Sequence, residues 1–261
     1  MALEYNLDHI SDKQKKTNIR KALSILEKAF YKKIETQSFF LDPFEQKILA
    51  EIANKNSVDI CFLGGNPDAE RKIFVANYYY EPLYEPNYIS VLEFEAEGIS
   101  HPDVLGAILS LGIDRNDIGD ISVLNGKVEF VISIEQASFV EFNLTKIKNE
   151  SVNLKIKEDA KLDLFKPEYD NLTGFVSSLR LDNLLSLFLS TSRTKAKEFV
   201  KARFVKVDFQ TIEDPSYKIE EGSLISVRRF GRFTYDGIDG YSKKGNYHIR
   251  YRKVKWYIWL L

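Results

Sequence analysis

The chain has 261 residues, of which 44% are hydrophobic and 29% are charged, so it can bury a core and wholesale disorder is excluded. No apolar run reaches the roughly 20 residues of a membrane-spanning helix, and the N-terminus has no apolar signal-peptide core, so we expect a cytoplasmic protein without membrane insertion. A single cysteine, Cys61, and three scattered histidines exclude a disulfide scaffold and indicate no metal site.

The formal net charge of −1 hides a division of the chain. Residues 1–174 carry 20 basic and 29 acidic side chains, a net charge of −9. Residues 175–261 carry 17 basic and 9 acidic side chains, a net charge of +8. We therefore expect the two parts to bind different partners.

Residues 1–57 are predicted to form a helical module. Apolar residues recur at helical spacing between residues 11 and 34, at Ile19, Leu23, Leu26, Phe30 and Ile34. A second helix is predicted from Asp42 to about residue 54, because Asp42 can cap it, Pro43 suits the first helical position and Glu45 can complete a capping box. The lysines of this module are interpreted as a solvated face.

Residues 58–160 are predicted to form a ferredoxin-like (RRM-like) βαββαβ domain preceded by a hairpin. The hairpin consists of the apolar runs 58–63 and 73–80 on either side of the loop GGNPDAERK. From residue 88 the expected order is strand, helix, strand, strand, helix, strand, with the last helix reaching residue 147. Asn125 and Gly126 suit the tight turn of the central hairpin, where both residues take positive φ.

RNA-binding sheets of this architecture stack bases on exposed aromatic side chains of their central strands. The matching strand here is GKVEFVISIE, in which Phe130 alternates with Glu129 and is expected to face the core. A stacking platform is missing and the region is acidic. The pattern therefore favours a protein-facing or scaffolding sheet over one that reads bases.

Residues 161–174 lack clear periodicity and contain Pro167 and Gly174, so they are interpreted as a linker. The last domain, residues 175–261, starts with two short helices. The apolar stripe of the first is Leu181, Leu184, Leu185 and Phe188. Ser192 is expected to cap the second helix, on which Arg193, Lys197 and Lys201 fall within an arc of about 80°.

This domain gathers many cations, and such clustering is typical of a surface that binds nucleic acid. Besides the three on the second helix, the candidate contacts are Arg180, Arg203, Lys206, Arg228, Arg229 and Arg232. The segments R-L-D-x-x-L, S-R-x-x-A-x-x-x-V and V-x-V resemble the S-four-like RNA-binding domain, over residues 179–233. The resemblance implies that structured RNA contacts the second helix and the following turn, here Arg180, Ser192, Arg193, Lys197, Lys201 and Lys206.

The whole chain resembles the YlmH family of bacterial ribosome-associated proteins, through GGNPDAERK, the S-four-like block, DPSYKIEEG, ISVRRFGRF and GYSKKG in that order. The resemblance implies binding to ribosomal RNA or to tRNA on the large ribosomal subunit, a role in translation quality control, and a link to cell division proteins through the acidic N-terminal part. The family has glycine where this chain has Arg203 and Arg229. Glycine there accommodates a positive φ, which costs arginine about 1 kcal/mol or more, so either the turn is reshaped or the extra cations strengthen phosphate contact. At Arg203, which closes the second helix, we expect a left-handed residue.

No enzymatic constellation is evident, and we expect a non-enzymatic protein without a cofactor. The triplet Arg180-Leu181-Asp182 resembles the catalytic motif of pseudouridine synthases, but it belongs to the first helix of the S-four-like domain, so Asp182 is interpreted as a helix-start residue. Cys61 lies within an apolar run and is expected to be a buried core residue. Glycine-rich nucleotide-binding motifs are absent from the sequence. Two alternatives stay open: an RNA-modifying enzyme or its accessory subunit, and a protein–protein adaptor for cell division.

Overall fold

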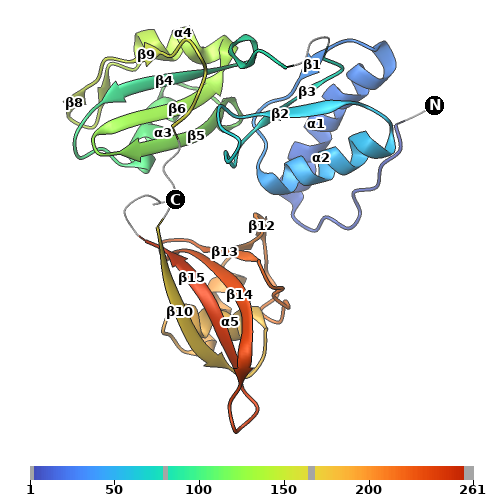
Figure 1. Ribbon diagram of the computed structural model, residues 1–261, viewed down its shortest axis with the longest axis vertical. Coiled ribbons are helices and arrows are strands. Elements are labelled where there is room, and N and C mark those ends of the chain that lie inside the picture. Colours follow the sequence, from blue (N-terminus) through green and yellow to red (C-terminus); the bar gives the residue numbers. More distant parts are fainter. Residues whose placement is uncertain (1–2, 79–81, 164–167, 256–261) are drawn as a thin grey trace. The chain divides into compact units, whose positions relative to one another are not determined.

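The computed structural model describes residues 3–78, 82–163 and 168–255. The chain divides into two compact units, Met1–Phe165 and Lys166–Leu261 (Figure 1). The fold is of mixed helix and sheet, as predicted. Within the described residues, no helix combines the length and the apolar character needed to cross a bilayer.

The first unit begins with two helices, α1 (Lys13–Lys32) and α2 (Pro43–Lys55), as the sequence predicts. The predicted capping box of α2 is present: Asp42 Oδ1 accepts from the Glu45 N–H at 3.2 Å, and Glu45 Oε2 accepts from the Asp42 N–H at 2.9 Å. The helices pack against a three-stranded sheet of order β1-β3-β2, formed by β1 (Thr36–Gln37), β2 (Ile60–Leu63) and β3 (Ile73–Ala76).

The hairpin of β2 and β3, expected to precede the second domain, packs one face against these helices and the other against β4 and β6. Phe74 and Ala76 of β3 lie in the same core as Leu23 of α1 and Leu49 of α2. The strand β1, which joins the sheet through β3, has only two residues and is too short to produce a periodic signal. The helical module is therefore an α/β module.

The ferredoxin-like arrangement follows. Its elements are β4 (Ile89–Glu95), α3 (His101–Ser110), β5 (Ile118–Leu124), β6 (Lys127–Ser133), α4 (Ile134–Asn143) and β9 (Lys155–Ile156). The strands pair antiparallel in the order β5-β6-β4-β9, which is the order of the predicted split-βαβ topology. Asn125 and Gly126 have φ of 49° and 79°, as their turn requires. The second helix ends at Asn143 instead of residue 147, and a short hairpin follows, formed by β7 (Lys146–Ile147) and β8 (Glu150–Ser151).

Both faces of this sheet are covered where β4, β5 and β6 lie side by side. Phe130 is fully buried in the core between the sheet and helices α3 and α4, which confirms its predicted orientation. On the other face, Phe40 lies against β5 so closely that a Cβ on Gly119 would come within 2.8 Å of its ring. Arg71, from the loop GGNPDAERK, donates hydrogen bonds to the carbonyl oxygens of Phe40 and Ile118, both at 2.9 Å. This loop therefore ties the α/β module to the sheet.

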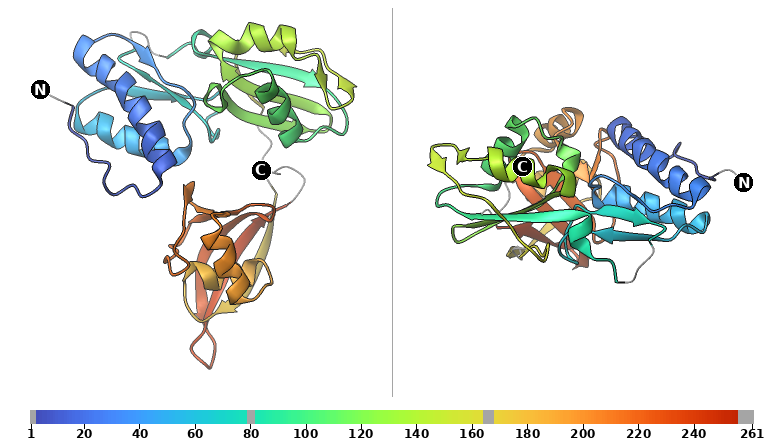
Figure 2. Two further views of the ribbon diagram at one scale, coloured as in Figure 1. Left: turned by 180° about the vertical axis from the view of Figure 1, so that it is seen from behind. Right: turned by 90° about the horizontal axis from the view of Figure 1, so that it is seen from above.

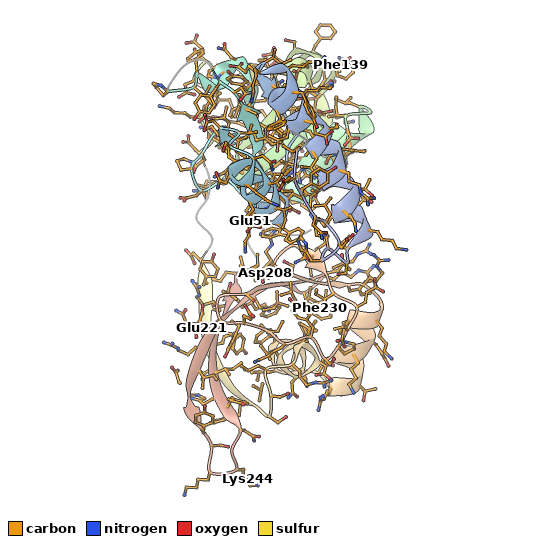
Figure 3. All side chains as sticks on the ribbon, turned by 90° about the vertical axis from the view of Figure 1, so that its right-hand side faces the viewer. Glu51, Phe139, Asp208, Glu221, Phe230 and Lys244 are labelled. Carbon is orange, nitrogen blue, oxygen red and sulfur yellow. The ribbon has the colours of Figure 1, made fainter. Side chains whose placement is uncertain are left out.

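The second unit is a six-stranded antiparallel sheet with helices on one face, as the front and back views show together (Figures 1 and 2). Its elements are β10 (Tyr169–Val176), α5 (Leu181–Phe188), α6 (Arg193–Lys201), β11 (Val205–Val207), β12 (Gln210–Thr211), β13 (Leu224–Val227), β14 (Gly231–Tyr241) and β15 (Tyr247–Val254). The sheet order is β10-β15-β14-β13-β11-β12. Lys244 lies at the tip of the β14–β15 hairpin (Figure 3).

The segment 161–174 is not a linker over its described residues. Leu162 is 2% exposed, lies in a hydrophobic cluster of the first unit and donates its N–H to the Gly65 carbonyl at 2.8 Å. Residues 169–174 belong to β10, which pairs with β15 over eight residues. Most side chains of β10 are exposed on both faces, so the strand lacks the alternation that would have revealed it. Residues 164–167 of the expected linker lie outside the described residues.

Candidate nucleic-acid interface

Asp182, in the first turn of α5, places a buried carboxylate in the candidate interface. Leu181, Leu184 and Leu185 are fully buried and fix the helix against the sheet. The backbone N–H groups of Leu181 and Asp182 donate to the carbonyl oxygens of Tyr217 and Pro215, at 2.8 and 3.0 Å. Asp182 therefore sits at the second position of α5, as a helix-start residue should, but its side chain is completely buried.

Three cations from two helices converge on the Asp182 carboxylate, and we call this group the Asp182 cluster. Arg180 donates to it through Nε and Nη2 at 3.2 and 3.3 Å, and Arg193 does so through the same two atoms at 3.0 and 3.3 Å. Lys197 Nζ lies 3.9 Å from Asp182 Oδ2. The side chains of the three cations stay 40–45% exposed, so one carboxylate holds three cations that still face solvent.

The protonation of Asp182 follows from this geometry. Burial acts to raise the pKa of the carboxyl, but the hydrogen bonds from Arg180 and Arg193 and the charges of both bring the pKa below its ordinary value. The carboxylate is therefore ionised at neutral pH, and the Asp182 cluster keeps a net charge of +2. Two guanidinium planes held in fixed positions can each offer paired N–H donors to a phosphate.

Helix α6 carries the predicted cationic arc. Ser192 caps the helix, as expected, by accepting from the Lys195 N–H at 3.2 Å. Ala196 and Val200 are buried on the other side. Arg193 and Lys197 join the Asp182 cluster, whereas Lys201, one turn further on, is exposed at the end of the helix.

The turn after α6 has the left-handed residue that the family resemblance implies. Arg203 has φ of 62°, its N–H donates to the Val200 carbonyl at 3.0 Å, and the Phe204 N–H donates to the Phe199 carbonyl at 3.1 Å. These two hydrogen bonds form a Schellman motif, whose left-handed position favours glycine. Arg203 Nε lies 3.5 Å from Glu213 Oε1, which is its ion-pair partner in this turn.

The remaining candidates differ in their exposure. Arg228 is exposed, lies 5.5 Å from the centre of the Phe204 ring, and donates its N–H to the Phe204 carbonyl at 2.9 Å, so it lies beside the turn after α6. Arg229 is exposed and also has a left-handed φ, of 70°. Lys206 is exposed on β11. Arg232, at the start of β14, is only 9% exposed, and its guanidinium lies over the Phe209 ring, so it is the least accessible of these candidates.

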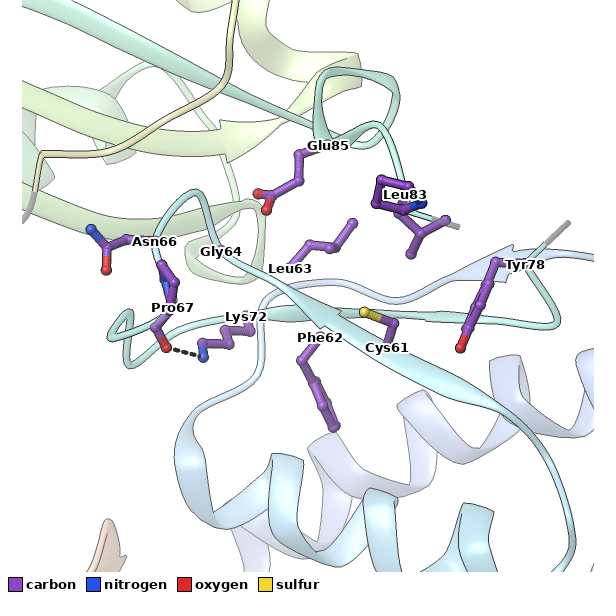
Figure 4. A pocket seen from close by; sticks show the side chains of 11 residues that line it. Cys61, Phe62, Leu63, Gly64, Asn66, Pro67, Lys72, Tyr78, Leu83 and Glu85 are labelled. Atoms are coloured by element: carbon purple, nitrogen blue, oxygen red, sulfur yellow. Dashed lines mark hydrogen bonds between the residues drawn. The ribbon is translucent and has the colours of Figure 1, made fainter. Parts of the chain in front are cut away.

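The first unit offers a different kind of site. A cavity of about 690 Å³ lies beside β2 and is lined by Cys61, Leu63, Tyr78, Leu83, Glu85 and neighbouring residues (Figure 4). Cys61, expected to be a buried core residue, is only half-buried there. This cavity contains none of the cations that the sequence assigns to RNA binding.

Comparisons with known proteins agree with this geometry. A model of the S4 domain matches residues 179–225, which include the Asp182 cluster, and a model described as "Putative RNA-binding domain in YlmH" matches residues 92–161. The small ribosomal subunit protein uS4 of Streptococcus uberis is 44% identical over 50 residues, which are 19% of this chain and 25% of that protein. The fold and the cation cluster thus define an S4-domain protein.

Two further matches extend over most of the chain. The ribosome-associated protein quality control protein P2 of Bacillus subtilis is 31% identical over 229 residues, which are 83% of this chain and 86% of that protein. The structure of the cell division protein ylmH from Streptococcus pneumoniae matches with a TM-score of 0.51 at 18% identity, covering 59% of this chain and 96% of that chain. The latter shows a common fold. The chain belongs to the YlmH family.

Proposed function

We propose that the protein is a non-enzymatic RNA-binding protein that docks its S4 domain on structured ribosomal RNA or on tRNA held by the ribosome. The observation that carries the proposal is the Asp182 cluster, in which Arg180 and Arg193 are fixed by a buried carboxylate and remain partly exposed. When such cations neutralise RNA phosphates, the counterions bound to the RNA are released, and this release drives binding. The turn with Arg203 and Arg228 extends the cationic surface past the end of α6.

The proposal includes association with the large ribosomal subunit and a role in translation quality control. The name of the Bacillus subtilis relative supports the association with ribosomes and with quality control. A link to cell division proteins, through the acidic first unit, is supported by the net charge of −9 over residues 1–174 and by the name of the Streptococcus pneumoniae protein.

A pseudouridine-synthase role for the Arg180-Leu181-Asp182 triplet receives no support. A catalytic carboxylate has to reach its substrate. The Asp182 side chain is 0% exposed, and both of its oxygens already accept hydrogen bonds from Arg180 and Arg193. Asp182 is therefore better suited to hold cations than to attack a base.

The test is sedimentation of cell extract containing the triple variant Arg193→Ala/Lys197→Ala/Lys201→Ala. Wild type should comigrate with the large subunit, and the variant should stay near the top of the gradient. With purified RNA, the slope of log K against log salt should fall by about one unit for each phosphate that the variant no longer neutralises.

The matched control is Lys13→Ala/Lys21→Ala/Lys28→Ala, which removes the same charge from the exposed face of α1. This control should sediment like wild type. If the α6 variant is folded, as judged by thermal melting, and still comigrates with the large subunit, the proposed function is wrong.

A further inference from the structure

The sheet of the second unit has an outer face, opposite its helices, which carries both aromatic and basic side chains. Val176 of β10 and Ile249 and Tyr251 of β15 lie in the core beneath the helices. Because side chains alternate along a strand, the residues between them point away from the helices. Among these outer-face residues are six on which the argument depends: Tyr169, Thr173 and Phe175 of β10 and His248, Arg250 and Arg252 of β15.

The pairing of β10 with β15 sets these side chains next to one another. Phe175 is opposite His248, and their rings stack with centroids 4.7 Å apart. Near the other end of the strands, the Arg252 guanidinium lies 5.1 Å from the centre of the Tyr169 ring. Asp236 of β14 accepts from Arg252 Nε at 2.8 Å and from Nη2 at 2.8 Å, which fixes the guanidinium in place.

These groups are accessible. Phe175 is 57% exposed and Tyr169 is 38% exposed, although aromatic side chains of this size are usually buried. The Arg250 side chain, held at 2.9 Å by Asp239, is 55% exposed. The hairpin 231–255 carries seven Lys or Arg residues against two Asp, so the surroundings of the aromatic rings are positive.

Exposed aromatic rings with arginines between them, on a positively charged sheet, are typical of surfaces that bind single-stranded nucleic acid. Every base has a face that can stack on an aromatic ring or a guanidinium, whereas bases within a duplex are already stacked on one another. We propose that the outer face of β10 and β15 is a second RNA-binding surface, which takes unpaired nucleotides by stacking them on the Phe175–His248 and Tyr169–Arg252 pairs.

This surface is distinct from the S4 site. The S4 family model spans residues 179–225, and all six outer-face residues lie outside that range. The Asp182 cluster is built on α5 and α6, which cover the opposite face of the sheet. The inference rests on the proposed function, because it gives the same domain a second contact: phosphates of structured RNA at the helices and unpaired bases at the sheet.

The test uses the full chain and two RNAs, a hairpin and the same hairpin with a single-stranded uridine tail, with affinity measured by fluorescence anisotropy. Wild type should bind the tailed RNA more tightly than the plain hairpin. Phe175→Ala should weaken binding of the tailed RNA about tenfold and leave binding of the plain hairpin unchanged. Phe175→Tyr, which keeps an aromatic ring, should behave like wild type.

Leu172→Ala is the matched control, because Leu172 is also exposed on β10 but points to the other face. It should not change binding of either RNA. With 4-thiouridine in the tail, photo-crosslinks should map to β10 and β15.

The results that would overturn this inference differ from those that would overturn the proposed function. If wild type binds the hairpin but gains nothing from the tail, or if Phe175→Ala keeps the gain while folded, the second surface is wrong and the S4 site stands. If Phe175→Ala keeps the gain but no longer comigrates with ribosomal subunits, the outer face binds protein, which also overturns the inference. If wild type binds neither RNA, the proposed function fails and the second surface with it.

Discussion

The ferredoxin-like sheet of the first unit and the six-stranded sheet of the second unit are both packed against helices on one face. They differ in what lies on the opposite face. Each packs helices on one face, where Phe130 in the first and Phe233 in the second are completely buried. On the other face, the first sheet is covered by Phe40 and held by the buried carboxylate of Glu129. The second leaves Phe175 and Arg250 exposed.

This difference matters more for function than the topology does. The ferredoxin-like order of strands occurs in many RNA-binding domains, but in this chain the strand face that such domains use is occupied by the chain itself. The sheet with aromatic and basic side chains facing solvent is in the other unit, in a topology that is not ferredoxin-like. The side chains that face solvent, and not the strand order, indicate which sheet is suited to stack bases.

The largest effect is expected when alanine replaces a phenylalanine on the face of each sheet that lies opposite its helices. Phe40→Ala should lower the free energy of unfolding of the first unit by about 4 kcal/mol, because the ring is fully buried and its loss leaves a cavity above Gly119. Phe175→Ala should change the stability of the second unit by less than about 1 kcal/mol, because its ring is mostly exposed. Urea denaturation of the full chain measures both.

The same two substitutions should have the opposite order of effect on RNA binding. Phe40→Ala protein that is still folded should bind the tailed RNA like wild type, whereas Phe175→Ala should not. Loss of RNA affinity in the folded Phe40→Ala variant would break the comparison, since it would make the covered sheet the base reader.

Much of this architecture could be predicted from the sequence, because the signals are local. The capping box at Asp42 and Glu45, the Asn125-Gly126 turn and the Ser192 cap each depend on a few adjacent residues. The left-handed backbone at Arg203 was predictable from the family glycine. The strands β4, β5 and β6 are short, mostly buried runs bounded by turn and helix-start signals, so they could be recognised along with their order.

The features that could not be predicted depend on contacts between distant residues. Strand β10 pairs with β15, almost eighty residues further along the chain, and carries no alternation of its own. Asp182 reads as a helix-start residue, and only the fold brings Arg193, eleven positions later, onto its carboxylate. The sequence pattern of such a cluster is R-x-D, here Arg180 and Asp182, followed by an arginine and a lysine four residues apart, here Arg193 and Lys197.

The next largest effect is expected from removing the charge of a buried carboxylate that binds cations, Asp182 in the second unit or Glu129 in the first. Asp182→Asn removes the charge that Arg180 and Arg193 share, and should lower the free energy of unfolding of the second unit by about 2 kcal/mol. RNA binding should weaken several-fold although the net charge rises by one, because the guanidinium groups lose their fixed positions. Glu129→Gln, which removes the carboxylate bound to Lys157, should cost similar stability in the first unit without changing RNA affinity.

The pH dependence of this effect has a definite sign. The pKa of Asp182 is lowered in the folded state, so its contribution to stability is present above the unfolded pKa of about 4 and is lost as the pH falls through the folded value. The stability difference between wild type and Asp182→Asn should therefore shrink below about pH 4. A difference that stays constant down to pH 2 in thermal melts would mean that folding does not lower the pKa of Asp182.

The smallest effect concerns the turn after α6, where conformational strain and charge can be separated at Arg203. Because φ is 62° there, Arg203→Gly should raise the free energy of unfolding of the second unit by about 1 kcal/mol, which corresponds to a rise in melting temperature of roughly 4–8 °C. Arg203→Ala keeps the Cβ and its strain, so it should give no such gain. Both variants lack the guanidinium, and RNA affinity should fall equally in both or be unchanged in both. Thermal melting and anisotropy on the same two proteins measure the two quantities: a lower melting temperature for Arg203→Gly than for Arg203→Ala would contradict a left-handed turn, and unequal RNA affinities would mean that the backbone, not the cation, determines the contact.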